Sequence, residues 1–396
     1  MMNNRKSVYD LLLRMEKGAY SKIILDIESK KYENLPQDKK FIAALFYGVI
    51  ERQLTLDYII GKLSELNPDP PTRILLRMAL YQILFMNSVP DSAAVNQSVE
   101  LAQKRSKGYV NAVLRNFLRQ NAEKDFLTEI NASDDLSVKY SCPDWLIDKW
   151  QSEYGEESTL QILRTSLLKP PTFEKDGIVQ DLSSRQACEL LDPQPGETIL
   201  DVCAAPGGKS FTIAKMMKNT GRVVSCDINR KKLSLLEKKA KQMELFTIEA
   251  KANDAKVYNP KLLEINNPDL ISLIEPRILD HTKMQEFYAD RVLCDVPCSG
   301  LGVIRRKPEI KYKNPADFEG LPTVQSQILW TSAKYVKQGG VLMYSTCTLS
   351  RRENDEVVDG FVEKSPDFTL MTKKTVIPSE DGGDGFFTAV LTRGTR

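Results

Sequence analysis

Histidine is nearly absent from this chain, which has one, His281, among its 396 residues. A Ser-His-Asp triad, a histidine-rich metal site or a histidine proton relay would each have to use that single side chain. The sequence therefore favours chemistry carried by other groups, and no metal site is predicted.

Paired cysteines are missing as well. The cysteines are odd in number, scattered along the chain and without a Cys-x-x-Cys pair, which disfavours both a secreted disulfide framework and a structural zinc site. A reducing, intracellular compartment is expected. The seven residues are Cys142, Cys188, Cys203, Cys226, Cys294, Cys298 and Cys347.

The chain also lacks long hydrophobic runs and a large excess of charge of one sign. The longest apolar stretch, residues 42–50, is far shorter than the ~20 residues that cross a bilayer, and the first residues lack the apolar core of a signal peptide. A cytoplasmic protein without membrane contact is predicted. Lys and Arg total 55 against 53 for Asp and Glu, so a nucleic-acid site would have to be a local patch.

The residue pattern divides the chain into three parts, in keeping with roughly 100–200 residues per domain. Residues 1–125 repeat apolar side chains at helical spacing, as Val8, Leu11 and Met15 do, and predict an all-helical domain. Residues 126–176 form a connector. The predicted helices of the first part cover 41–66, 72–86, 93–104 and 108–118.

From residue 177 to 396 short β-rich runs alternate with helical patterns. This alternation predicts an α/β domain with a doubly wound, mostly parallel sheet. The predicted strands are 198–202, 222–226, 291–294 and 340–344, and the predicted helices are 209–218, 230–243 and 324–337.

A glycine-bearing loop joins the first of these strands to a helix. Gly207 and Gly208 allow the backbone to approach a ligand closely. The loop has no GxGxxG, and Cys203 stands where a triphosphate-binding GxxxxGK[ST] loop needs its first glycine. A nucleoside-type ligand is favoured, with Asp227 offering a carboxylate to a ribose diol. An ordinary strand-to-helix turn is the alternative.

Two cysteines directly follow two predicted strands. Cys298 lies in Asp295–Gly300 and Cys347 ends Tyr344–Cys347, at carboxyl ends of strands, where open parallel sheets bind ligands. A thiolate that adds to C6 of a cytosine makes C5 nucleophilic toward a methyl group. A carboxylic acid at N3 would stabilise that adduct, and Asp295 is placed for this role. Chemistry alone does not choose between the two thiols, and buried structural thiols are the alternative, which we favour for the other cysteines.

Motifs around these residues form a specific set. They are Val179–Ser184, Leu200–Lys209, Cys226–Ile228, Asp295–Ile310, Tyr344–Thr348 with Glu353 and Asn354, and Gly382–Arg393. Together they resemble the RNA (cytosine-5) methyltransferases of the Sun, Fmu and RsmB type. The segments 94–102 and 107–115 resemble the NusB-like RNA-binding domain that this subgroup carries.

The resemblance implies the fold, the cofactor and the roles of the site residues. It implies a Rossmann-like class I methyltransferase domain behind an all-α NusB-like domain, with S-adenosyl-L-methionine as cofactor. Cys347 would be the nucleophile, Cys298 would assist product release, Asp295 would face N3 of the base, and Lys209 would lie near that base. The residues implied to bind the cofactor are Cys203, Ala204, Ala205, Pro206, Gly207, Gly208, Lys209, Asp227, Arg230, Asp254 and Asp295.

The implied substrate is one cytosine of 16S ribosomal RNA, and the protein is expected to act as a monomer. Alternatives are a tRNA cytosine-C5 methyltransferase, a non-catalytic NusB-like RNA-binding factor, and a DNA cytosine methyltransferase with Cys298 as nucleophile. Basic clusters predict contacts to RNA phosphates. Their residues are Lys104, Arg105 and Arg115, and then Arg305, Arg306 and Lys307, with Lys311 and Lys313 nearby.

The chain also departs from the family pattern. The segment between Pro171 and Val179 is short, Arg185 replaces the usual glutamine, and residues 255–290 resemble an insertion. These departures affect the expected RNA-docking surface more than the expected chemistry.

Overall fold

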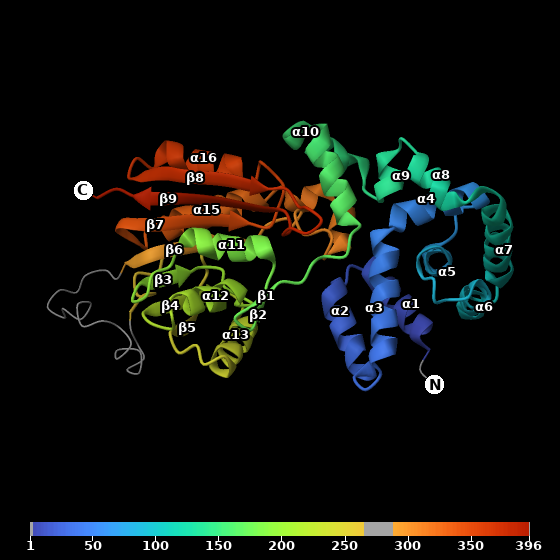
Figure 1. Cartoon of the computed structure of the whole chain (residues 1–396), viewed down its shortest axis with the longest axis horizontal. Coiled ribbons are helices and arrows are strands. Elements are labelled where there is room, and N and C mark those ends of the chain that lie inside the picture. The colour runs from blue at the N-terminus through green and yellow to red at the C-terminus, as the bar shows by residue number, and fades with distance from the viewer. Residues whose placement is uncertain (1–2, 265–287, 396) are drawn as a thin grey trace. The chain divides into compact units, whose positions relative to one another are not determined.

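The computed structural model describes residues 3–264 and 288–395. His281 and most of the predicted insertion at 255–290 therefore lie outside the described residues. The chain divides into two compact units, Met1–Leu167 with Ile304–Tyr312, and Leu168–Val303 with Lys313–Arg396 (Figure 1). Within the described ranges, no helix is long and apolar enough to cross a membrane.

The first unit is helical, as the apolar spacing predicts. Its helices bury their apolar faces in two clusters, one containing Val8 and Phe46 and the other containing Leu76 and Phe117. Its elements are α1 (Asn4–Glu16), α2 (Ser21–Ser29), the short 3-10 helix η1 (Lys30–Tyr32), α3 (Pro36–Glu51), α4 (Gln53–Leu63), α5 (Pro70–Phe85), α6 (Asp91–Leu101), α7 (Lys107–Lys124), α8 (Phe126–Ala132), α9 (Leu136–Tyr140), α10 (Asp144–Ser166) and η3 (Pro308–Tyr312).

The predicted single helix at 41–66 is two helices, because α3 ends at Glu51 and α4 begins at Gln53. The Glu51 carbonyl accepts hydrogen bonds from Lys311 Nζ at 3.0 Å and from the Tyr312 hydroxyl at 3.4 Å. Residues 304–312 thus complete the helical unit, although they lie far along the chain. Lys311 is 1% exposed, so its inclusion in a basic surface cluster was wrong.

The second unit contains a seven-stranded sheet in the order β5-β4-β3-β6-β7-β9-β8. Strands β3 to β7 pair in parallel and β9 runs antiparallel to both neighbours, which confirms the predicted doubly wound, mostly parallel sheet. The chain winds outward from β3 through β4 and β5 and then continues on the other side with β6. Such a switch point is where open α/β sheets bind ligands.

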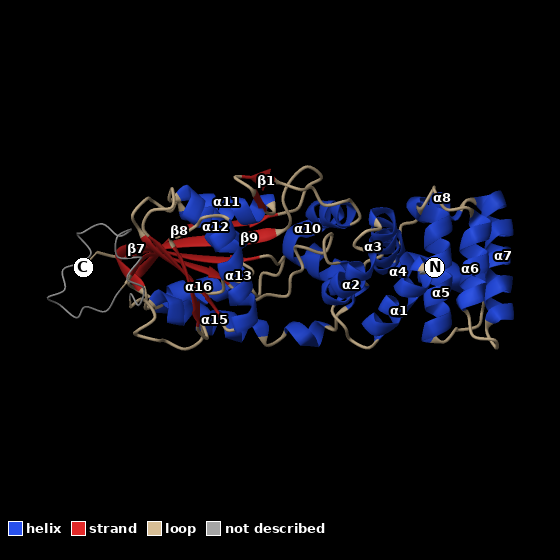
Figure 2. Cartoon of the chain, turned by 90° about the horizontal axis from the view of Figure 1, so that it is seen from below, coloured by secondary structure: helices blue, strands red, loops and turns tan. Residues whose placement is uncertain are grey.

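Helices cover both faces of this sheet (Figure 2). One apolar cluster joins the sheet to α11, α12 and α13, and the other joins it to α15 and α16. The bounds are β1 (Glu174–Lys175), β2 (Ile178–Val179), α11 (Leu182–Leu191), β3 (Thr198–Asp201), α12 (Gly208–Met216), β4 (Arg222–Asp227), α13 (Arg230–Gln242), β5 (Ile248–Ala252), β6 (Ala289–Asp295), η4 (Pro315–Phe318), α15 (Leu321–Ala333), β7 (Val336–Thr346), α16 (Asp355–Lys364), β8 (Phe368–Val376) and β9 (Phe386–Arg393).

Two local features differ from the sequence expectation. The helix predicted at 324–337 ends at Ala333, because Val336 already pairs with Ala289 at the start of β7. The short connector holds a hairpin, β1–β2, and Arg185 donates to Asp176 in its turn at 3.0 Å. The arginine that departs from the family motif therefore fixes this hairpin.

Candidate active site

The loop between β3 and α12 is held in one conformation by a glycine. Gly207 has φ +110°, and a Cβ there would lie 2.5 Å from the Phe211 ring. A side chain at this position would therefore be both strained and obstructed. The Ala204 amide donates to the Cys226 carbonyl at 2.7 Å, which fixes the loop against the end of β4.

Lys209 and Asp295 form an ion pair, with 2.7 Å between Nζ and Oδ2. The other carboxylate oxygen of Asp295 accepts from the Ser345 hydroxyl at 2.9 Å. Burial lowers the pKa of Lys209, but the Asp295 carboxylate and the neighbouring Cys347 outweigh it, and the resulting pKa lies above the usual lysine value. Lys209 therefore carries a positive charge near the Cys347 thiol, and such a charge favours a thiolate.

The structure brings the two strand-end cysteines together. The Sγ atoms of Cys298 and Cys347 lie 3.4 Å apart. This follows from the register of β6 and β7, which pairs Asp295 with Ser345, so the turns that follow start side by side. The contact with Cys347, together with burial, raises the pKa of the Cys298 thiol well above its usual value.

The turn after Asp295 is also fixed through its glycines. The Gly302 amide donates to the Cys347 carbonyl at 3.1 Å, and the Gly302 carbonyl accepts from the Gly385 amide at 2.9 Å. A Cβ on Gly302 would collide with the Gly385 carbonyl. Gly385, which lies directly before β9, thereby supports both cysteine turns.

Four of the other five cysteines are buried, whereas Cys298 and Cys347 are partly exposed. Burial raises the pKa of Cys142, Cys188 and Cys294 to about 12, and it also raises the pKa of Cys226. These thiols stay protonated at neutral pH and therefore lack nucleophilic character. Cys203 is partly exposed within the glycine loop, and burial raises its pKa too.

The predicted cofactor residues lie at the carboxyl ends of adjacent strands. Asp227 ends β4 and accepts from the Asn229 amide at 2.7 Å, and Asp254 follows β5 and accepts from the Lys256 amide at 3.0 Å. Both carboxylates are half-buried, and Arg230 is exposed at the start of α13. A Cβ on Gly208 would meet no atom closer than 3.8 Å, which leaves room for a ligand. Partly exposed carboxylates at strand ends can accept hydrogen bonds from the hydroxyl groups of a nucleoside.

Some functional groups were not recognised in the sequence. Asp201, at the end of β3, is buried and accepts from the Ser210 hydroxyl at 2.7 Å, and burial raises the pKa of its carboxyl to about 7. Glu353 and Asn354 were noticed only as part of a motif, yet both contact the cysteine turns. The available signal was their position a few residues after Cys347 in the motif.

The predicted RNA-binding residues differ in exposure. Lys104, Arg105 and Arg115 are exposed on the helical unit, and Arg105 pairs with Asp69 at 3.2 Å. The second group also belongs to the helical unit, within residues 304–312. There Lys307 is exposed, Arg306 is partly exposed and Arg305 is 5% exposed, so Lys307 presents the most open cation of the three.

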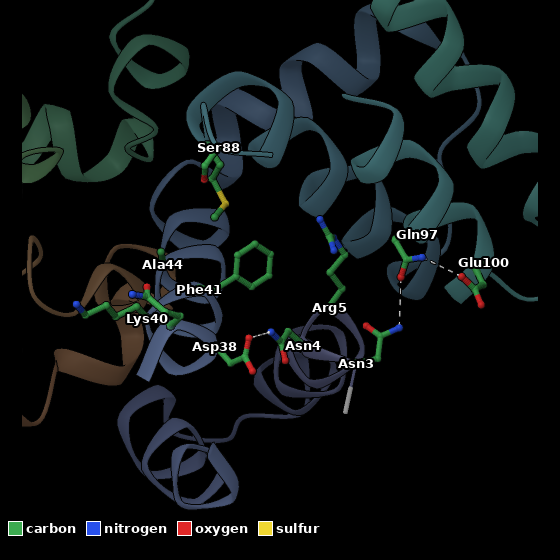
Figure 3. A pocket seen from close by; sticks show the side chains of 12 residues that line it. Asn3, Asn4, Arg5, Asp38, Lys40, Phe41, Ala44, Ser88, Gln97 and Glu100 are labelled. Carbon is green, nitrogen blue, oxygen red and sulfur yellow. Dashed lines mark hydrogen bonds between the residues drawn. The ribbon is translucent and has the colours of Figure 1, made fainter. Parts of the chain in front are cut away.

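A separate pocket lies in the helical unit (Figure 3). Its wall includes Arg5, whose guanidinium lies 5.3 Å from the centre of the Phe41 ring. Asn4 donates to Asp38 at 2.7 Å and Gln97 donates to Glu100 at 3.1 Å. This pocket is lined mostly by polar and charged side chains and contains no cysteine, unlike the strand ends of the second unit.

Comparisons with known proteins identify two families that match this chain. The family description "16S rRNA methyltransferase RsmB/F" matches residues 188–392, and the NusB family matches residues 2–119. The probable ribosomal RNA small subunit methyltransferase B of Bacillus subtilis is 32% identical, with 97% of each chain covered. A Synechocystis protein of the same description is 30% identical, covering 95% of this chain and 96% of its own.

Solved structures show the same fold. The crystal structure of PH0851 superposes with a TM-score of 0.70 at 22% identity and covers 99% of each chain. Together with the two family matches, this confirms both the predicted resemblance and the predicted fold class. The chain therefore belongs to the 16S rRNA methyltransferase RsmB/F family and carries a NusB-family helical region ahead of its methyltransferase fold.

Proposed function

We propose that this protein transfers the methyl group of S-adenosyl-L-methionine to C5 of a cytosine in 16S ribosomal RNA. The observation that carries the proposal is the contact of two thiols, Cys298 and Cys347, beside the Lys209–Asp295 ion pair. A covalent route through C6 needs a nucleophilic thiolate, a polar group at N3 and help with release. All three lie at the ends of β6 and β7.

Cys347 is the nucleophile in this proposal. The Lys209 cation favours its thiolate, which attacks C6 of the cytosine and forms a carbon–sulfur bond. Asp295 faces the N3 edge, and the proton held between Lys209 and Asp295 neutralises the charge that develops on the ring. C5 would then take the methyl group of the cofactor, leaving S-adenosyl-L-homocysteine. Loss of the C5 proton to a base restores the C5–C6 double bond and expels Cys347 as a thiolate, while the N3 proton returns to the Lys209–Asp295 pair. Cys298 assists this release.

The residues that would hold the cofactor are the loop 203–209, Asp227, Arg230 and Asp254, with Asp295 alongside. S-adenosyl-L-methionine supplies the electrophilic methyl group. The Asp227 carboxylate suits a ribose diol, and the backbone around Gly208 allows a close approach. The cytosine must leave its helix, because C5 and C6 have to be reached by both thiolate and cofactor.

The substrate assignment is supported by the relatives, whose descriptions name the small ribosomal subunit RNA. The exposed cations Lys104, Arg115 and Lys307 suit contacts with RNA phosphates. A single chain supplies every residue of the proposed site, so we expect a monomer to be active. Transfer RNA is the competing substrate, because the chemistry at the cytosine would be the same.

The test compares two variants with labelled cofactor and unmethylated 16S rRNA. Cys347→Ala is expected to transfer no methyl group, and Cys298→Ala is expected to accumulate a protein–RNA adduct that survives denaturation. Cys142→Ala, whose thiol lies in the helical unit, serves as the matched control and should retain activity. Full activity of Cys347→Ala would overturn the mechanism, and methylation of transfer RNA in place of 16S rRNA would overturn the substrate.

A further inference from the structure

Two consecutive residues, Glu353 and Asn354, contact different cysteine turns. They follow β7 and lie just before α16, and they are 3% and 0% exposed. A carboxylate buried to this degree is costly unless hydrogen-bond donors surround it. The partners of each residue therefore show what the two side chains hold in place.

Glu353 binds the turn that contains Cys298. Its Oε2 accepts from the Ser299 amide at 2.9 Å, and its Oε1 accepts from the Ser299 hydroxyl at 2.6 Å. Gln325 donates to Glu353 Oε2 at 2.9 Å and to the Pro297 carbonyl at 3.0 Å. Both neighbours of Cys298 are thus fixed to one carboxylate, directly on one side and through Gln325 on the other.

Asn354 binds the turn that contains Cys347. Its amide nitrogen donates to the Thr348 carbonyl at 2.9 Å, and its oxygen accepts from the Thr346 hydroxyl at 2.6 Å. Both neighbours of Cys347 are therefore fixed to this amide. A further hydrogen bond, 2.6 Å between the hydroxyls of Ser299 and Thr348, joins the two turns.

We propose that Glu353 and Asn354 are positioning residues with separate tasks. Glu353 holds Cys298 where it assists release of the methylated RNA, and Asn354 holds Cys347 where it attacks the base. This division rests on the proposed function, because it presumes a covalent adduct with separate formation and release. It follows that loss of either side chain stops the reaction at a different stage.

The experiment uses the full-length protein with labelled cofactor and 16S rRNA, and it measures the adduct and the released methylated RNA separately. Glu353→Ala is expected to form the adduct at close to the wild-type rate but to release product roughly 10- to 100-fold more slowly, the loss typical of hydrogen bonds to a charged group. Asn354→Ala is expected to slow adduct formation itself by a similar factor. A protein that has merely lost its fold would form no adduct.

Two milder variants distinguish the loss of these hydrogen bonds from unfolding of the protein. Glu353→Gln keeps an oxygen that accepts from the Ser299 amide, so most of the release rate should return. Ser299→Ala removes the hydroxyl donor but keeps the amide, so adduct should accumulate to a smaller extent. The proposal is wrong if Glu353→Ala and Ser299→Ala both release product at the wild-type rate, or if Asn354→Ala forms adduct normally.

The adduct formed by Cys298→Ala separates a wrong covalent mechanism from a wrong task for Glu353. If Cys298→Ala forms no adduct with any RNA, the covalent mechanism itself is wrong. If Cys298→Ala traps the adduct and Glu353→Ala does not, only the task given to Glu353 is wrong.

Discussion

The ammonium group of Lys311 donates to the backbone carbonyl of Glu51, 260 positions earlier in the chain, at 3.0 Å. Burial lowers the pKa of Lys311 to about 8, against an ordinary value of 10.5. Below pH 8 the side chain is charged in both the folded and the unfolded states, so the folded protein bears the full cost of the buried charge. Above pH 8 the folded state loses this proton first, and the cost diminishes.

Lys311→Met is therefore expected to stabilise the protein at pH 7, with a gain that shrinks as the pH rises toward 10. A shift of this size corresponds to about 3 kcal/mol, of which roughly 1 kcal/mol is lost again with the hydrogen bond to Glu51. Urea unfolding of wild type and variant at pH 7 and pH 9.5 measures the difference. Burial also raises the pKa values of Cys142 and Tyr312. Burial raises the pKa of Glu51 as well, and the Lys311 charge lowers the pKa of both Glu51 and Cys142, so the measured difference includes the response of these two groups to the lost charge. A variant less stable than wild type at pH 7 would contradict the expectation.

Substitution of Lys209 should separate chemistry from binding. Lys209→Met removes the cation beside Cys347 and leaves the Asp295 carboxylate without its ion-pair partner. The methylation rate constant is expected to fall by roughly 100-fold, in line with the loss of one charged group at a reacting centre. The measurement is single-turnover methyl transfer at saturating RNA and cofactor, alongside cofactor affinity by calorimetry. A loss confined to cofactor affinity would place Lys209 outside the chemistry.

Substitution of Gly302 tests the contact of Gly385, directly before β9, with the turn that contains Cys298. A methyl group on Gly302 meets the carbonyl oxygens of Gly385 and Cys347, so Gly302→Ala must displace the backbone at both turns. A destabilisation of about 1–3 kcal/mol and a marked loss of activity are expected. Gly320→Ala is the matched control, because a Cβ there meets nothing within 4 Å. Equal stability and activity of the two variants would refute the close approach of Gly302 to the Gly385 carbonyl.

The exposed basic residues of the helical unit should contribute to RNA affinity and to its dependence on salt concentration. Replacing Lys104, Arg105 and Arg115 together by Ala is expected to weaken 16S rRNA binding. The slope of log affinity against log salt concentration should also become shallower, by about 0.7–0.9 for each phosphate that loses its contact with a cation. Fluorescence anisotropy at several salt concentrations measures both effects. Lys364→Ala, an exposed cation at the end of α16, is the control. An unchanged slope in the triple variant would remove these residues from the RNA interface.

The approach of Cys298 to Cys347 was predictable because motif and topology agree. Once Asp295 and Ser345 are placed on neighbouring parallel strands, the thiols that follow must approach each other. Periodicity could not locate the break at Arg52, because the apolar pattern continues across it. At this break the Glu51 carbonyl accepts from Lys311, a long-range contact that the local apolar pattern does not reveal. For the same reason Lys311 appeared to be one more surface cation, whereas only the fold reveals its burial.

The placement of residues 304–312 has a consequence for the order of events during synthesis. The helical unit is translated first, but its packing is complete only after Tyr312 has left the ribosome, when much of the methyltransferase sheet has already emerged. Until then the carbonyl at the end of α3 lacks the donors that Lys311 and Tyr312 provide. A gene fragment that stops at residue 167 would therefore encode a helical unit without the segment that supplies these donors.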